Sequence, residues 1–140
     1  MNTSLKIILL STFVFVAASC NKDDESPSTK ILTLNIQGLA DLGANYVYEG
    51  WLMVNGSPVS SGRFTVNSSG QLSKTSFEVS YSQLTTATAF ILTIEPAIND
   101  TPAPSSVHIL AGDFSGNSGT VSIAHSAALG NNFSAATGKY

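Results

Sequence analysis

The chain has 140 residues, enough for one domain. Hydrophobic residues make up 43% of it and charged residues only 11%, against a usual charged share of about 25%. The net charge is −3 and no basic cluster occurs, which argues against nucleic-acid binding, and lysine, glutamate and arginine are too few for a helical bundle.

The first predicted element is an export leader. A short segment with one lysine precedes Ile7–Ala18, an apolar run of twelve residues, which is too short to span a bilayer because a spanning helix takes about 20. Small residues then lead to Cys20, the only cysteine. This pattern predicts a signal peptide over residues 1–19. Because a cysteine follows the small residues, the leader resembles a bacterial lipoprotein signal.

That resemblance implies that Cys20 is lipidated. In such proteins the thiol takes a diacylglycerol, the leader is removed before the cysteine, and the new amine is acylated, for example with palmitate. Ala17 stands where the family usually has leucine. A lone thiol in an oxidising compartment is a liability unless it is consumed, which favours lipidation over a chance cysteine after an ordinary signal peptide. Two or three acyl chains would attach the chain stably to a membrane.

An acidic tether follows the cysteine. Residues 20–29 are polar, too polar to fold alone. The segment resembles the short acidic signal that takes some lipoproteins to the outer face of the outer membrane, and its alternative interpretation is a solvated spacer. We therefore expect an outer-membrane, surface-exposed lipoprotein, with the cytoplasmic membrane or a periplasm-facing position as alternatives. The residues of this export signal are Lys22, Asp23, Asp24 and Glu25.

The folded domain is predicted over residues 30–140, with a first strand at Ile31–Gln37. The clearest element is a β-hairpin over Tyr46–Val66. Its first strand is apolar on both faces, which is typical of a central strand. Asn55 and Gly56 tolerate the positive φ of a tight turn, and the loop has two to four residues.

Further strands are expected after the hairpin, separated by turns. One lies within Gln71–Tyr81, and a short helical turn is an option over Gln83–Thr88. The proline-rich stretch Pro96–Ser106 cannot be a central strand. We predict an all-β protein, an antiparallel immunoglobulin-like β-sandwich of about seven strands, which needs no metal or disulfide to fold. The later strands are Ala89–Glu95, Val107–Ala111 and Thr120–His125, with a turn at Asp113–Gly119.

Several of these stretches are similar to the extracytoplasmic domain of anti-sigma-K factors. The likeness covers nearly all of Ile31–Tyr140 and implies a fold and an envelope role such as sensing. Family members that regulate sigma factors carry a sigma-binding domain and a transmembrane helix first. Here a lipoprotein signal stands instead, so we expect no sigma-factor binding. The matching stretches are Tyr48–Leu52, Asn55–Phe64, Phe90–Pro96, Pro102, Pro104 and His108–Gly112.

The end of the chain also differs from that family. In similar sequences a strand continues past the position of Tyr140. The resemblance therefore implies either a domain that lacks its last strand or a chain that continues.

Candidate chemistry is sparse. His108 and His125 could form a metal site with Asp113 or Glu95, but no close ligand spacing supports it, so strand or surface histidines are favoured. Glu49 and Glu95 lie in apolar strands. A catalytic carboxylate pair is conceivable here, but outward-facing glutamates are the favoured interpretation. There is no Gly-x-Ser-x-Gly elbow. We predict no catalytic residue, no metal and no cofactor, and hence no enzyme.

Trp51, Tyr48 and Glu49 are the candidate ligand contacts. Exposed aromatic rings here would form a platform for sugars, whereas a buried Trp51 would pack in the core against Phe90. Two functions follow. The first is a lipid-anchored, non-enzymatic envelope domain that binds or senses a protein partner. The alternative is a glycan-binding accessory module.

Overall fold

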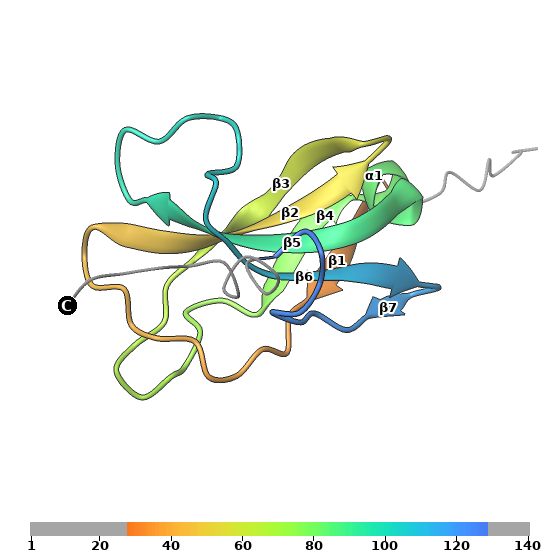
Figure 1. Cartoon of the computed structure of the whole chain (residues 1–140). Coiled ribbons are helices and arrows are strands. Elements are labelled where there is room, and N and C mark those ends of the chain that lie inside the picture. The colour runs from red at the N-terminus through yellow and green to blue at the C-terminus, as the bar shows by residue number, and fades with distance from the viewer. Residues whose placement is uncertain (1–27, 129–140) are drawn as a thin grey trace, which may run out of the picture.

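The computed structural model describes residues 28–128 (Figure 1). The predicted leader, Cys20 and the acidic signal Lys22–Glu25 lie outside the described residues, as does the end of the predicted domain. Their predictions therefore stay as stated.

The described part of the chain forms seven strands and one short helix in two sheets. β1 and β4 make a two-stranded sheet, and the other strands make a five-stranded sheet in the order β3-β2-β5-β6-β7. All strand pairs are antiparallel, so the all-β prediction with about seven strands is confirmed. The immunoglobulin-like arrangement stays a prediction. The elements are β1 (Thr29–Thr33), β2 (Tyr46–Val54), β3 (Ser57–Phe64), β4 (Ser76–Ser80), α1 (Tyr81–Thr86), β5 (Ala87–Pro96), β6 (His108–Ser115) and β7 (Ser118–Gly119).

The β2–β3 hairpin is the best-predicted element. β2 lies between β3 and β5, as its two apolar faces indicated. Val54 pairs with Ser57, so the loop has the two residues Asn55 and Gly56, with φ of 51° and 77°. Positive φ at both positions is the geometry that the right-handed twist of a hairpin favours.

A β-bulge interrupts this hairpin halfway. Gly50 pairs with Gly62 but Trp51 pairs with Ser60, which leaves Ser61 as the extra residue. Gly62 has a φ of 126°, and a Cβ there would lie 2.7 Å from the ring of Phe77. Glycine is therefore required at this position, both by the backbone conformation and by the close approach of β4.

Two predicted strands have different bounds. Ile31–Gln37 was expected as one strand, but β1 ends at Thr33 because its partner β4 begins at Ser76. The strand predicted at Thr120–His125 is wrong. The backbone of Thr120 lies over Gly112, and this breaks the pairing with β6, which resumes only as a bridge between Ser122 and Ala111.

Three other boundaries also differ. β6 continues to Ser115, so the predicted turn at Asp113–Gly119 narrows to Gly116 and Asn117, and Gly116 has a φ of 62°. The helical turn is real but begins at Tyr81, earlier than expected. β4 accordingly occupies only the second half of Gln71–Tyr81.

The main core lies between the two sheets, and a smaller cluster lies on the opposite face of the five-stranded sheet. Trp51 belongs to the smaller cluster, with Ile91, Ala111 and Ala128. The expected packing against Phe90 is therefore wrong. Trp51 pairs with Ile91 across the sheet, and neighbouring residues of a strand face opposite sides.

Candidate functional site

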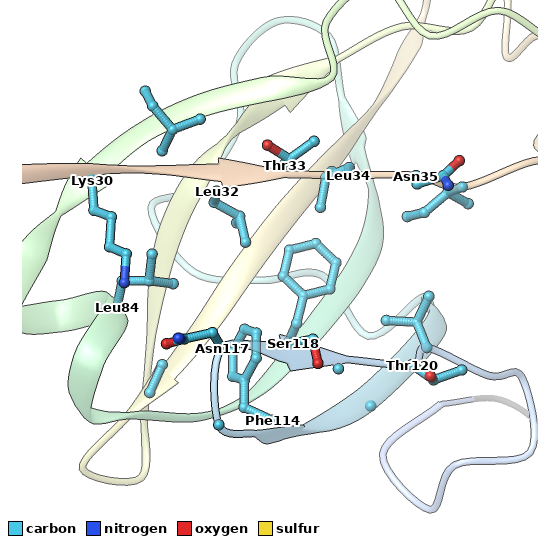
Figure 2. Close-up of a pocket in the computed structure, with 18 of the residues that line it drawn as sticks. Lys30, Leu32, Thr33, Leu34, Asn35, Leu84, Phe114, Asn117, Ser118 and Thr120 are labelled. Carbon is cyan, nitrogen blue, oxygen red and sulfur yellow. The ribbon is translucent and has the colours of Figure 1, made fainter.

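A groove of about 670 Å³ opens between the two sheets, on the side where β1 and β7 form their edges (Figure 2). We call it the inter-sheet groove. β1 and the residues after it form one wall, and the β6–β7 turn with the following residues forms the other. Residues of α1 and the start of β5 close one end, where Figure 2 places Leu84 beside Lys30.

The floor of the groove is apolar and its rim is polar. Leu32 of β1 and Leu34 just after it point toward Phe114 on β6 (Figure 2), and Phe90 of β5 also lines the groove. The rim carries amides and hydroxyls from both walls. It includes Asn35, Thr85, Asn117, Ser118 and Thr120.

One edge of β1 has no strand partner within residues 28–128. Leu34 N–H donates to Thr75 and Tyr81 N–H donates to Ser28, each across the β1–β4 ladder. Hydrogen-bonded pairs alternate along an antiparallel ladder, so the even-numbered residues of β1 bond to β4. The backbone groups of Thr29, Ile31 and Thr33 therefore point to the free edge, at the mouth of the groove.

Lys30 carries the one charge among the side chains that line the groove. Its ammonium group lies 5.8 Å from the centre of the Tyr81 ring, and no carboxylate pairs with it within the described chain. The groove thus offers apolar surface, unpaired backbone groups and one positive charge, which suits binding of an extended ligand with a carboxylate.

The opposite face of the five-stranded sheet is closed by buried polar contacts. Glu49 accepts a hydrogen bond from Ser60 at 2.5 Å and lies 3.4 Å from the guanidinium of Arg63. Arg63 also reaches Asp100 at 3.4 Å and donates to the carbonyl of Pro96. We call these four side chains, Glu49, Ser60, Arg63 and Asp100, the Arg63 cluster. It fastens the loop between β5 and β6, which projects beyond the sheets in Figure 1, to β2 and β3.

Glu95 makes a second set of buried contacts nearby. Its carboxylate accepts from the hydroxyl of Thr93 and from the backbone N–H of Ser105, at 2.8 Å for Ser105. Thr93 in turn accepts from the Trp51 indole at 2.9 Å. The other carboxylate oxygen of Glu95 has no hydrogen-bond partner. Glu95 is 1% exposed and Glu49 6%, so the two candidate acids are enclosed by their own structural contacts.

The candidate ligand contacts are also buried. Trp51 is 3% exposed and Tyr48 2%. Tyr48 stacks on Phe64, with ring centres 5.5 Å apart, and its hydroxyl donates to the carbonyl of Ala40 at 2.8 Å. Burial raises the pKa of the Tyr48 phenol above its usual 10.0; Asp41 adds to this, and the Ala40 hydrogen bond opposes it. Neither these rings nor Glu49 line the groove.

The histidines form no common site. His125 lies 3.4 Å from Asp113, whereas His108 contacts the carbonyl of Ala127 at 2.9 Å. Among residues 28–128, no three histidine, cysteine or acidic side chains come together in a way that could hold a metal ion. In the same region no helix has both the length and the apolar character to cross a bilayer.

The groove residues were not singled out from the sequence. The sequence predicted a first strand at Ile31–Gln37, but nothing local indicated which strands would pair with it. The groove results from the pairing of β1 with β4, which lie more than 40 residues apart in the chain, and from the short hairpin that β7 forms with β6.

These features describe an all-β domain with an open inter-sheet groove. The sequence matches the family described as "Anti-sigma-K factor rskA, C-terminal" over residues 24–109, well over half of the chain, and the chain belongs to that family. The match runs from the tether into β6, so β7 and the Asn117 side of the groove lie beyond it. Searches of curated proteins and of solved structures returned no significant match.

Proposed function

We propose that this chain is a lipid-anchored domain of the cell envelope that binds a partner in the inter-sheet groove and so acts in sensing. The observation that carries the binding role is the groove itself, with its apolar floor and the free edge of β1. The leader and Cys20 support the anchor, and membership of the anti-sigma-K C-terminal family supports an extracytoplasmic role.

The alternative of a glycan-binding module is less well supported. Stacking on a sugar requires an exposed aromatic face, and Trp51 and Tyr48 are enclosed. Tyr46 is 51% exposed, but it is a single ring outside the groove. The groove is therefore the better candidate for ligand contact.

Anchoring is tested in cells with an alkyne analogue of palmitate. We expect the wild-type chain to be labelled and to sediment with membranes, and Cys20→Ala to lose the label. Two chains stabilise attachment far more than one, because each buried methylene contributes about 0.8 kcal/mol. Lys22→Ala is the matched control, since it leaves the thiol in place and should keep the label. Equal labelling of the wild type and Cys20→Ala would contradict the anchor.

Binding in the groove is tested separately with a photo-crosslinking side chain in intact cells. We expect an adduct when it replaces Asn117 at the rim. Ser68, which is exposed in the turn between β3 and β4 and lies outside the groove, serves as control position. Equal adducts at both positions, or none at Asn117, would contradict a groove-bound partner.

A further inference from the structure

We propose that the occupant of the inter-sheet groove is an extended peptide that adds to the free edge of β1 as an antiparallel strand, with a carboxylate near its C-terminal end at Lys30. This proposal rests on the proposed function and names its ligand class.

The edge supplies the hydrogen bonds. The backbone groups of Thr29, Ile31 and Thr33 face the mouth of the groove with no strand partner in the described structure. Natural edges are protected by charges, prolines or bulges. β1 has neither a proline nor a bulge, its one charge is Lys30, and its outer face carries two threonines and Ile31, which is 56% exposed. Such an edge is a template for strand addition.

The floor supplies the contacts for side chains. An added strand sends every second side chain toward the other sheet. Along β1 and the residue that follows it these inward positions are Lys30, Leu32 and Leu34, and the two leucines face Phe114 across the groove (Figure 2). The inward side chains of the peptide would lie beside them and fill the groove, whose volume of about 670 Å³ has room for small branched apolar groups. The peptide therefore alternates apolar and polar residues.

The charge supplies the direction. Lys30 lies at the end of the groove closed by α1, near the start of β1. An antiparallel strand runs opposite to β1 and so ends beside Lys30. A carboxylate there would meet an ammonium group that has no acidic partner in the described chain. Antiparallel pairing also continues the pattern of both sheets and is slightly the more stable arrangement.

The probe is an acetylated peptide, Thr-Val-Thr-Val-Thr with a free C-terminal carboxylate, as long as the five residues of β1. In the antiparallel register its valines lie opposite Lys30 and Leu32 and point into the groove. We expect nitrogen-15 NMR titration of the full chain to shift the amide signals of Thr29, Ile31 and Thr33. No shift at these amides would overturn the proposal.

Two paired comparisons isolate the hydrogen bonds. Thr33→Pro removes a free-edge N–H without removing a β1–β4 bond, and Thr33→Val changes the side chain but keeps that N–H. We expect Thr33→Pro to weaken binding about tenfold and Thr33→Val to have little effect. N-methylation of the central threonine of the peptide should weaken binding to the wild type similarly, whereas N-methylation of a valine, whose N–H points away from β1, should not. This second pair keeps the test valid if Thr33→Pro does not fold.

The charge is tested with the C-terminal amide of the same peptide and with Lys30→Gln. An exposed ion pair is worth only a few-fold in affinity, so we expect each change to weaken binding about threefold, and the two together no more than either alone. Tighter binding of the amide would overturn the assigned direction.

The competing occupant of this edge is a second copy of the chain. Lysine on an edge strand hinders such self-pairing. Sedimentation velocity distinguishes it. A wild type that dimerises, with Thr33→Pro monomeric, would overturn the peptide proposal. If the peptide does not bind but the Asn117 adduct persists in cells, strand addition fails and the proposed function stands. If that adduct is absent as well, both fail.

Discussion

The two faces of the five-stranded sheet are built in different ways. The face toward β1 and β4 is almost purely apolar and ends in an open groove, where one edge of β1 has no strand partner among residues 28–128. The opposite face carries buried charges, but each lies within the Arg63 cluster or the Glu95 contacts and fastens the loop between β5 and β6. The buried ionisable groups of the described chain thus hold the structure together, whereas the polar groups left accessible for a ligand are those of the β1 backbone edge.

The largest effect should come from the closed face. Trp51→Ala removes the ring that packs on Ile91 and Ala111 and leaves Thr93 without its indole donor. We expect a loss of about 4 kcal/mol in the free energy of unfolding, measured with urea. Phe114 lines the groove and is half-buried. Phe114→Ala should therefore lower the free energy of unfolding by only about 1 kcal/mol, because the ring is already partly exposed. Similar losses for the two variants would contradict the contrast between a closed face and an open one.

Breaking the Arg63 cluster should have an intermediate effect. Arg63→Met keeps the aliphatic stem and removes the charge that faces Glu49, whose side chain is 8% exposed. We expect a loss of about 2 kcal/mol, at the low end for a buried pair because the Arg63 side chain is 35% exposed.

The matched experiment is a double-mutant cycle with Glu49→Gln. Since the glutamine carries no charge to leave unpaired, the Arg63→Met change should cost less in that background. A cost that does not depend on Glu49 would show that Arg63 acts only through Pro96 and Asp100.

The smallest effect should come from Tyr48 and should depend on pH. Tyr48→Phe removes the hydrogen bond to Ala40, and we expect a loss of about 1 kcal/mol near pH 7. In the wild type, the folded chain keeps the phenol protonated above pH 10.0, where the unfolded chain loses the proton. Stability contributed by this group is therefore complete below pH 10.0 and is lost as the pH rises through the raised pKa.

Urea unfolding between pH 8 and pH 11 provides the measurement, with Tyr46→Phe as the control because Tyr46 is 51% exposed. Tyr48→Phe should show a flatter decline at high pH than the wild type, and Tyr46→Phe should follow the wild type. Parallel curves for the wild type and Tyr48→Phe would contradict a buried, protonated phenol.

Local patterns predicted much of the fold. Asn55-Gly56 predicted the hairpin turn, because its geometry needs a backbone conformation that few residues adopt. The strand predicted at Thr120–His125 was wrong because its apolar alternation carries no information about the close approach of Thr120 to Gly112. The groove was not predicted for a related reason. It opens beside the edge of β1 that has no strand partner among residues 28–128, and no local pattern shows which strand lacks a neighbour.

The sequence by itself determined the strand-rich class of the chain and its central hairpin, because hydrophobic periodicity and turn chemistry act over a few residues. The tertiary structure alone decided that Trp51 faces away from Phe90, that Glu49 pairs with Arg63, and that β1 has one edge without a strand partner in the described part of the chain, beside Lys30. Each of these depends on strand register and sheet order, which arise from contacts between segments far apart in the chain.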